Sequence, residues 1–206
     1  MKLKPFRHVL IFGTLGSGKT SIAYHLTEPP LTRLVVVDTV REDRYNSAGV
    51  VVYDPVHLAE LMEGERFRVV FRPQDKEAVR WAFLLGYEKQ NCTLLVEEIS
   101  QYATAGQMCE GMEDVIRFGR HQNCRIVATT QRPADVHKLL VSQSEIYLGK
   151  LFETNDARYL RGLSGVTKET IEAATRLPDP ALKEGVLTVF YVDPLDNTSK
   201  RVLVSI

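Results

Sequence analysis

The sequence predicts an α/β domain in which helices cover both faces of a mostly parallel sheet. Apolar stretches of buried-strand length, such as His8–Phe12 and Thr93–Val96, alternate with segments of helical spacing. Strands that are apolar throughout are typical of parallel sheets, because helices bury both of their faces. A chain of 206 residues suits one such domain and is too short for two with linkers. We therefore expect a single domain over residues 1–206.

The individual elements follow from apolar periodicity and from turn residues. Strands are expected at His8–Phe12, Leu34–Val37, Val50–Tyr53, Phe67–Phe71, Thr93–Val96, Cys124–Thr130 and Glu145–Leu148. Helices are expected at Ser21–Thr27, His57–Glu63, Asp75–Lys89, Met108–His121, Ala134–Val141, Asp156–Arg161 and Thr167–Thr175. Arg41–Gly49 and Gln101–Gln107 are polar, and we expect turns or loops there. The sheet core then occupies about residues 8–150, and 151–206 adds helices and a hairpin of Gly185–Val192 with Lys200–Val204.

A glycine-rich motif stands between the first strand and the first helix. Residues 13–20 read GTLGSGKT and fit the phosphate-loop pattern G-x-x-x-x-G-K-[ST]. Glycines let successive backbone N–H groups turn toward an anion, and the helix N-terminus adds partial positive charge. Lys19 would reach the β- and γ-phosphates of ATP, and the Thr20 hydroxyl would ligate Mg²⁺. The expected nucleotide-binding residues are Gly13, Thr14, Gly16, Ser17, Gly18, Lys19 and Thr20.

Acidic and amide side chains follow two later strands. Glu97 and Glu98 come directly after Thr93–Val96, and Gln131 follows Cys124–Thr130. Ligands of parallel sheets bind outside the carboxyl ends of the strands, where all three residues fall. We expect Glu97 to hold the metal, through coordinated water, and Glu98 to polarise the attacking water. Aspartate is commoner at the first position, so the division of roles between the two acids stays open. Gln131 could sense the γ-phosphate and orient the water.

The composition limits the other function classes. Lys+Arg and Asp+Glu number 26 each, so the global charge argues neither for nor against nucleic acid. A local basic excess lies between residues 117 and 138. Cys92, Cys109 and Cys124 are widely spaced and form no C-x-x-C pair, so the sequence does not predict a zinc site. Cysteines of this kind fit a reduced, cytoplasmic setting. No apolar run approaches the length of a membrane span.

Together these motifs resemble the FtsK/HerA class of P-loop motor ATPases. The matching segments are Gly13–Thr20, Leu94–Glu98 and Arg117–His121 followed by Ile126–Pro133. The most specific part is Arg117–His121 together with the strand and the Thr-Gln-Arg-Pro sequence that follow it. Within that class the chain is most similar to the small genome-packaging ATPases of tailless, membrane-containing viruses. The resemblance covers about residues 8–150 and implies a RecA-like fold. It also implies a homo-oligomeric ring, usually a hexamer, with ATP at the subunit interfaces and double-stranded DNA in the channel.

The resemblance also implies an arginine finger supplied by the neighbouring subunit. Arg117 and Arg120 match the helix-borne arginines of the class, with Arg120 preferred because it is nearer the following strand. The guanidinium group is always charged and can bind a γ-phosphate through two bonds. The alternative is that these arginines are solvated and pair with Glu113 or Asp114 at helical spacing.

Partners and location follow from the same resemblance. Gln101–Gln107 is the candidate channel loop, and an ordinary surface loop is its alternative. No signature of base-specific reading occurs, so we expect DNA contacts without sequence preference. A capsid or membrane vertex protein would dock the ring, in the host cytoplasm or at the virion vertex.

Two further functions use the same phosphate loop. A small-molecule or nucleoside kinase would need an arginine-rich lid, to which Arg158 and Arg161 could belong. A nucleotide-gated assembly module would bind ATP with negligible turnover. The paired acids with a downstream glutamine favour a water-activating ATPase over the kinase, and binding without turnover would support the assembly module.

Overall fold

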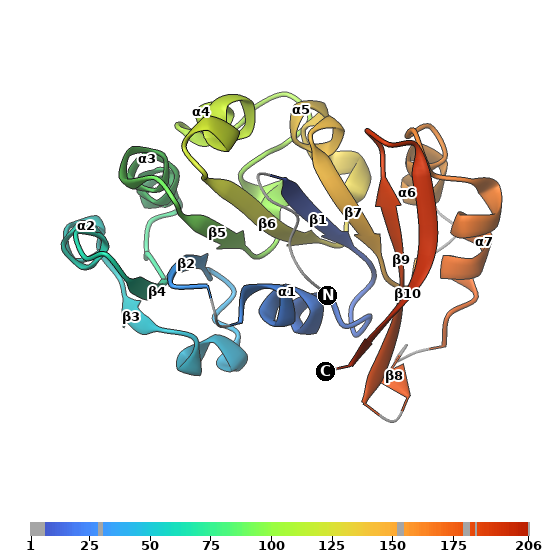
Figure 1. Ribbon diagram of the computed structural model, residues 1–206, viewed down its shortest axis with the longest axis horizontal. Coiled ribbons are helices and arrows are strands. Elements are labelled where there is room, and N and C mark those ends of the chain that lie inside the picture. Colours follow the sequence, from blue (N-terminus) through green and yellow to red (C-terminus); the bar gives the residue numbers. More distant parts are fainter. Residues whose placement is uncertain (1–6, 29–30, 152–154, 179–181, 184, 206) are drawn as a thin grey trace.

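The computed structural model describes residues 7–28, 31–151, 155–178, 182–183 and 185–205. Their strands form one sheet in the order β10-β9-β7-β1-β6-β5-β2-β4-β3, with β8 paired to β9 (Figure 1). All pairs from β7 through β3 are parallel, and β8, β9 and β10 add antiparallel pairs. The bounds are β1 His8–Phe12, β2 Arg33–Val37, β3 Val50–Val52, β4 Phe67–Phe71, β5 Thr93–Val96, β6 Arg125–Thr130, β7 Ser144–Leu148, β8 Leu182–Lys183, β9 Val186–Asp193 and β10 Thr198–Ser205.

Helices cover both faces of this sheet, as the sequence predicts. In Figure 1, α2 to α5 lie above the sheet and α1 lies below it. The helices are α1 Lys19–Thr27, α2 Pro55–Met62, α3 Arg80–Lys89, α4 Met112–Phe118, α5 Lys138–Ser142, α6 Asn155–Leu160 and α7 Lys168–Thr175. Short 3-10 segments are η1 Asp43–Ser47, η2 Lys76–Val79, η3 Ile99–Gln101, η4 Gly119–His121 and η5 Pro133–Asp135.

Successive residues of each strand point into two separate cores. In β1, Leu10 and Phe12 join a core with side chains of α2 to α7, whereas Val9 and Ile11 join a second core with α1 and η1. This period of two is the expected result of pleating, and it explains why the strands are apolar throughout. The predicted α/β fold with a mostly parallel sheet is therefore confirmed.

Three predicted segments differ in detail from the structure. The predicted helix Asp75–Lys89 begins as η2, where the Asp75 carboxylate accepts from Glu77 N at 3.0 Å, and becomes α3 only at Arg80. The predicted helix Met108–His121 begins as α4 only at Met112, because Gly111 adopts a left-handed conformation with φ 78° that ends the preceding turn. The polar segment Arg41–Gly49 is not an open turn but contains η1.

The C-terminal hairpin forms as predicted and extends the same sheet. β9 pairs with β7 at Ile146–Val192, Tyr147–Tyr191 and Leu148–Phe190, and β10 pairs with β9 along its length. Within the part of the chain that the structure describes, no helix has the length and apolar character needed to cross a bilayer.

Candidate active site

The predicted site segments meet at the carboxyl edge of the sheet. The phosphate loop follows β1, the acids follow β5, and Gln131 follows β6. β6 pairs with both β1 and β5, so these three strands are consecutive neighbours. The strand order therefore places the loop, the acids and the glutamine side by side.

The phosphate loop is anchored by the ends of two neighbouring strands. Gly13 N donates to Thr130 O at 3.3 Å, and Thr14 N donates to Lys150 O at 2.9 Å. Gly18 has φ 84°, and a Cβ at this position would lie 2.6 Å from a methyl carbon of Leu187. Both the backbone conformation and the close approach of β9 therefore require glycine here.

The loop offers groups that suit a bound phosphate. The Lys19 ammonium is buried and donates to Thr14 O at 3.0 Å inside the loop. Burial lowers the pKa of Lys19, while the carboxylates of Glu98, Glu97 and Glu42 act in the opposite direction. The hydroxyls of Thr14 and Ser17 are buried and have no hydrogen-bond partner in the described structure. An anion with several oxygens would satisfy these donors, so the residues present fit a polyphosphate.

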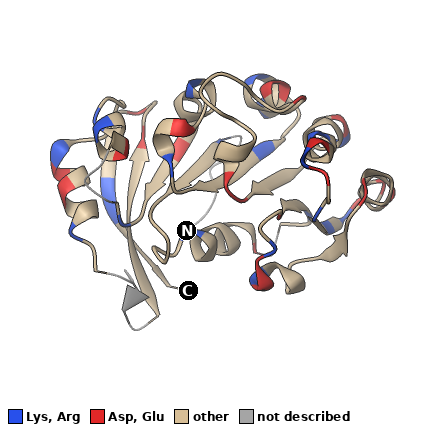
Figure 2. Cartoon of the chain, turned by 180° about the vertical axis from the view of Figure 1, so that it is seen from behind, with Lys and Arg blue, Asp and Glu red and all other residues tan. Residues whose placement is uncertain are grey.

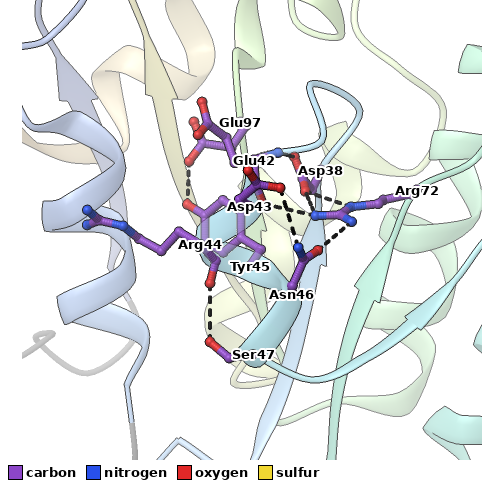
Figure 3. Close-up of polar contacts among 9 residues, drawn as sticks. All are labelled: Asp38, Glu42, Asp43, Arg44, Tyr45, Asn46, Ser47, Arg72 and Glu97. Carbon is purple, nitrogen blue, oxygen red and sulfur yellow. Dashed lines mark hydrogen bonds and ion pairs between the residues drawn. The ribbon is translucent and has the colours of Figure 1, made fainter.

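Glu97 is buried and held by two donors. The hydroxyls of Tyr45 and Thr129 donate to its Oε1 and Oε2, respectively (Figure 3 shows the Tyr45 contact). Only 3% of Glu97 is exposed, and this burial raises its pKa, although both hydrogen bonds act to lower it. The carboxylate therefore has a defined orientation within the chain itself.

Glu98 lies closer to solvent and pairs with Gln131. The Gln131 Nε2 donates to Glu98 Oε1 at 3.1 Å, and the Glu98 backbone N donates to Thr129 Oγ1 at 3.3 Å. Glu98 has φ 49°, a left-handed conformation that is uncommon for a residue with a side chain. Glu98 is half-buried and Gln131 is exposed, so both can contact a water molecule at the edge. The geometry favours Glu98 over Glu97 as the residue that polarises water.

The residues present also fit Mg²⁺ bound together with a nucleotide. Thr20 lies in the first turn of α1, and its hydroxyl and the Glu97 carboxylate are hard oxygen donors of the kind that Mg²⁺ prefers. Among the described residues, no group of three or more His, Cys, Asp or Glu side chains could hold a metal alone. Mg²⁺ commonly takes one or two protein ligands and completes its shell with phosphate and water.

Arg117 and Arg120 lie away from this site, at the amino edge of the sheet. They line a cavity of about 820 Å³ together with His8, the first residue of β1, whereas the phosphate loop follows the last. Five residues of strand separate the two edges by roughly 16 Å. Arg117 Nε donates to Glu113 Oε1 at 2.6 Å, the helical pairing considered above, and Arg120 Nε lies 3.4 Å from His121 Nε2. The structure thus does not bring either arginine to the phosphate loop of its own chain.

The candidate channel loop is partly folded. Tyr102 and Ala103 are buried, and Ala103 and Thr104 form isolated bridges with Met108 and Val136. Residues 104–107 are exposed and form the tip of this loop.

Sequence reasoning missed the two residues that hold Glu97. Tyr45 stands in a segment whose polar composition indicates only a turn, and Thr129 lies inside a predicted strand. A single large aromatic residue in a polar segment was the available signal for Tyr45, since such a residue usually has a buried position.

The fold and the phosphate loop define the class of P-loop NTPases. Solved structures of the genome packaging NTPase B204 from Sulfolobus turreted icosahedral virus 2 share this architecture. The complex with ATP-gammaS has a TM-score of 0.76 at 18% identity and covers 97% of this chain and 98% of B204. The complex with AMPPCP has a TM-score of 0.74 at 17% identity, covering 96% and 97%.

A further match is B204, the DNA-packaging ATPase from Sulfolobus Turreted Icosahedral Virus. Its TM-score is 0.71 at 18% identity, covering 97% of this chain and 98% of that one. No protein-family model matches the chain, and no curated protein matches its sequence. The chain therefore has the fold of the viral packaging ATPases, and the likeness includes residues 151–206, which the sequence resemblance does not cover.

Proposed function

We propose that this chain is an ATP-hydrolysing subunit of a viral genome-packaging motor that translocates double-stranded DNA. The observation that carries the proposal is the meeting of the phosphate loop with the Glu98–Gln131 pair, in a fold shared along 97% of the chain with a genome packaging NTPase. The solved complexes of that NTPase with ATP-gammaS and AMPPCP support a nucleotide as the ligand.

Each residue at the carboxyl edge has a task in hydrolysis. The loop N–H groups and Lys19 bind the phosphates, and Thr20 and Glu97 would hold Mg²⁺, which neutralises phosphate charge when it is bound. Gln131 orients the Glu98 carboxylate, to which it already donates at 3.1 Å. Glu98 then accepts a hydrogen bond from the attacking water and takes its proton as the water oxygen bonds to the γ-phosphorus. The bond from that phosphorus to the β–γ bridging oxygen breaks in the same displacement, and ADP leaves with the electron pair.

Arg117 and Arg120 act on the nucleotide of a neighbouring subunit. They lie at the edge opposite the phosphate loop, so contact with a nucleotide requires that the amino edge of one chain meet the carboxyl edge of the next. Repeated contacts of this head-to-tail kind close into a ring when the rotation permits. We propose a hexamer, in line with the class that the sequence resembles.

DNA is held through phosphates and without sequence preference. Acidic and basic residues are intermingled along the elements that cover the sheet (Figure 2), and the formal net charge is zero. A ring multiplies each subunit's few cations, so a neutral chain can still bind DNA in a salt-dependent way. The exposed tip 104–107 is the proposed channel contact. The ring would dock on a capsid or membrane vertex protein, in the host cytoplasm or at the virion vertex.

Phosphate release from ATP tests the proposal. It is measured with and without long double-stranded DNA, at low and at moderate salt. The motor predicts stimulation by DNA that weakens as salt rises. Phosphate transfer to an acceptor in place of water would instead indicate the kinase, and ATP binding without turnover would indicate the assembly module.

A further inference from the structure

Tyr45 lies in the middle of a polar segment, yet it is completely buried. None of its surface is exposed, and it is among the largest fully buried side chains of the described residues. Its ring packs in the second core, with a centroid distance of 6.3 Å to the ring of Tyr24 on α1. A tyrosine that is buried in this way usually directs its hydroxyl to a specific partner.

That partner is the predicted metal-holding acid. The Tyr45 hydroxyl donates to Glu97 Oε1, and the Thr129 hydroxyl donates to Glu97 Oε2. The two donors reach the carboxylate from separate elements, η1 and β6. Together they fix the direction of the remaining lone pairs of Glu97, because each oxygen is held by a different part of the chain.

A buried ion pair holds η1 in place on both sides of Tyr45. The Arg72 guanidinium binds Asp38 Oδ2 at 2.7 and 2.8 Å and also donates to Glu42 O at 2.9 Å and to Asn46 Oδ1 at 2.7 Å (Figure 3). Asp38 is fully buried, and Arg72 is 8% exposed. Arg72 therefore ties the segment around Tyr45 to the ends of β2 and β4.

The same segment also contacts the helix behind the phosphate loop. Arg44 donates to the hydroxyl of Ser21, the residue after Thr20. η1 thus bonds to Glu97 and also to Ser21, which follows Thr20 in the sequence. Glu97 and Thr20 are the two residues predicted to hold Mg²⁺.

We propose that Tyr45 is a positioning residue, which orients the Glu97 carboxylate through its hydroxyl so that Glu97 receives the metal of the bound nucleotide. The proposal rests on the nucleotide-binding part of the proposed function and needs neither the ring nor DNA. Loss of a partner that orients a metal-holding residue typically weakens metal binding by about 10- to 100-fold.

The test measures metal affinity without turnover. Mn²⁺ serves as the spectroscopic substitute for Mg²⁺, and its binding to the protein with AMPPCP is followed by electron paramagnetic resonance. Tyr45→Phe removes one oxygen from a buried ring, and we expect Mn²⁺ to bind about 10-fold more weakly. Affinity for AMPPCP in EDTA should change by less than about twofold, because among the described residues the Tyr45 hydroxyl bonds to Glu97 and not to the phosphate loop.

Two further variants separate positioning from packing. Tyr24→Phe removes a hydroxyl from the neighbouring ring, which makes no hydrogen bond to Glu97 among the described residues, and it should bind Mn²⁺ as the wild type does. Arg72→Lys keeps the charge but loses the guanidinium fork that spans Glu42 and Asn46. It should weaken Mn²⁺ binding, as Tyr45→Phe does, while the Tyr45 side chain itself is unchanged. It also keeps the test available if Tyr45→Phe does not fold.

The outcomes distinguish this proposal from the proposed function. A wild-type protein that binds no Mn²⁺ with AMPPCP would contradict the proposed function itself. Wild-type binding that Tyr45→Phe leaves unchanged, or that Tyr24→Phe weakens equally, would overturn the role of Tyr45 while the proposed function stands.

Discussion

The carboxyl and amino edges of the sheet hold their functional side chains in different ways. At the carboxyl edge, Glu97 is buried between two hydroxyl donors, and Glu98 is bonded to Gln131. At the amino edge, Arg117 is about half exposed and, among the described residues, pairs with Glu113 on its own helix. Exposed pairs of this kind contribute little to stability, whereas a buried and fully bonded carboxylate is strongly constrained.

This contrast indicates what one chain can do alone. At the carboxyl edge the phosphate loop, the acids and the glutamine follow three neighbouring strands, and Glu98 is already bonded to Gln131, so we expect a single chain to supply the proposed nucleotide site. Arg117 and Arg120 lie at the opposite edge, roughly 16 Å away across β1. We therefore expect substitutions at the carboxyl edge to act within a chain and substitutions of the arginines to act between chains.

The largest effect should come from Lys19→Ala. This substitution removes the buried ammonium that donates to Thr14 O inside the loop and that we propose binds the phosphates, so phosphate release should fall by about 1000-fold or more. Lys168→Ala is the control, because Lys168 is exposed on α7 and pairs with Glu172 on the same helix. Normal turnover in Lys19→Ala, with a cooperative melting transition like that of the wild type, would refute the assignment of the site.

Mixed subunits test whether the amino edge acts between chains. Arg120→Ala should lose turnover on the order of 100-fold by itself, and so should Glu98→Gln. A mixture of the two should regain partial phosphate release, because some interfaces then combine an intact Glu98 with an intact Arg120. Arg117→Ala mixed in the same way shows which arginine is the finger. Absence of recovery for both arginines, in rings shown by native mass spectrometry to be mixed, would contradict the prediction that the amino edge acts between chains.

Gln131→Ala should have a smaller effect within one chain. Without the amide, Glu98 loses its 3.1 Å partner, and we expect kcat to fall by about 10-fold while KM stays nearly constant. Gln74→Ala is the matched control, because Gln74 is an exposed glutamine that follows β4 at the same edge. A rise in KM at constant kcat would instead assign Gln131 to nucleotide binding.

The last prediction concerns stability at the amino edge, where no effect on turnover at neutral pH is expected. His8 Nδ1 accepts from Ile126 N at 3.0 Å, and Nε2 therefore carries the hydrogen that faces Ile116 O at 3.2 Å. Burial lowers the pKa of His8 from 6.5 to about 4, because the protonated imidazole would place a charge in the core. A proton on Nδ1 would also break the hydrogen bond that Nδ1 accepts from Ile126 N. The unfolded chain takes up this proton first as the pH falls.

Stability should therefore decrease between pH 6.5 and about 4, with a slope of at most about 1.4 kcal/mol per pH unit from this group alone. Urea unfolding at several pH values measures the slope. His8→Gln should remove this contribution, and His121→Gln, on the surface of the same edge, should retain it. An identical slope in wild type and His8→Gln would show that His8 does not carry the effect.

Much of the fold was predictable because its signals are local. Apolar runs located the strands from β1 to β7, and the hairpin of β9 and β10 also formed near its predicted bounds. The predictions were wrong where a single residue decides the backbone, as at Gly111, whose positive φ delays α4 to Met112. Periodicity does not detect such an interruption, since the flanking residues keep their helical spacing.

The sequence by itself determined the phosphate loop, the two acids, the glutamine and the edge at which they lie. It could do so because parallel strands bring their carboxyl ends to one side, whatever their order. Only the tertiary structure decided that Glu97 is the buried acid, that Tyr45 holds it and that Arg72 fixes η1. These contacts join residues 26 to 52 positions apart, and pairing over such separations depends on strand order and packing, which no local pattern contains.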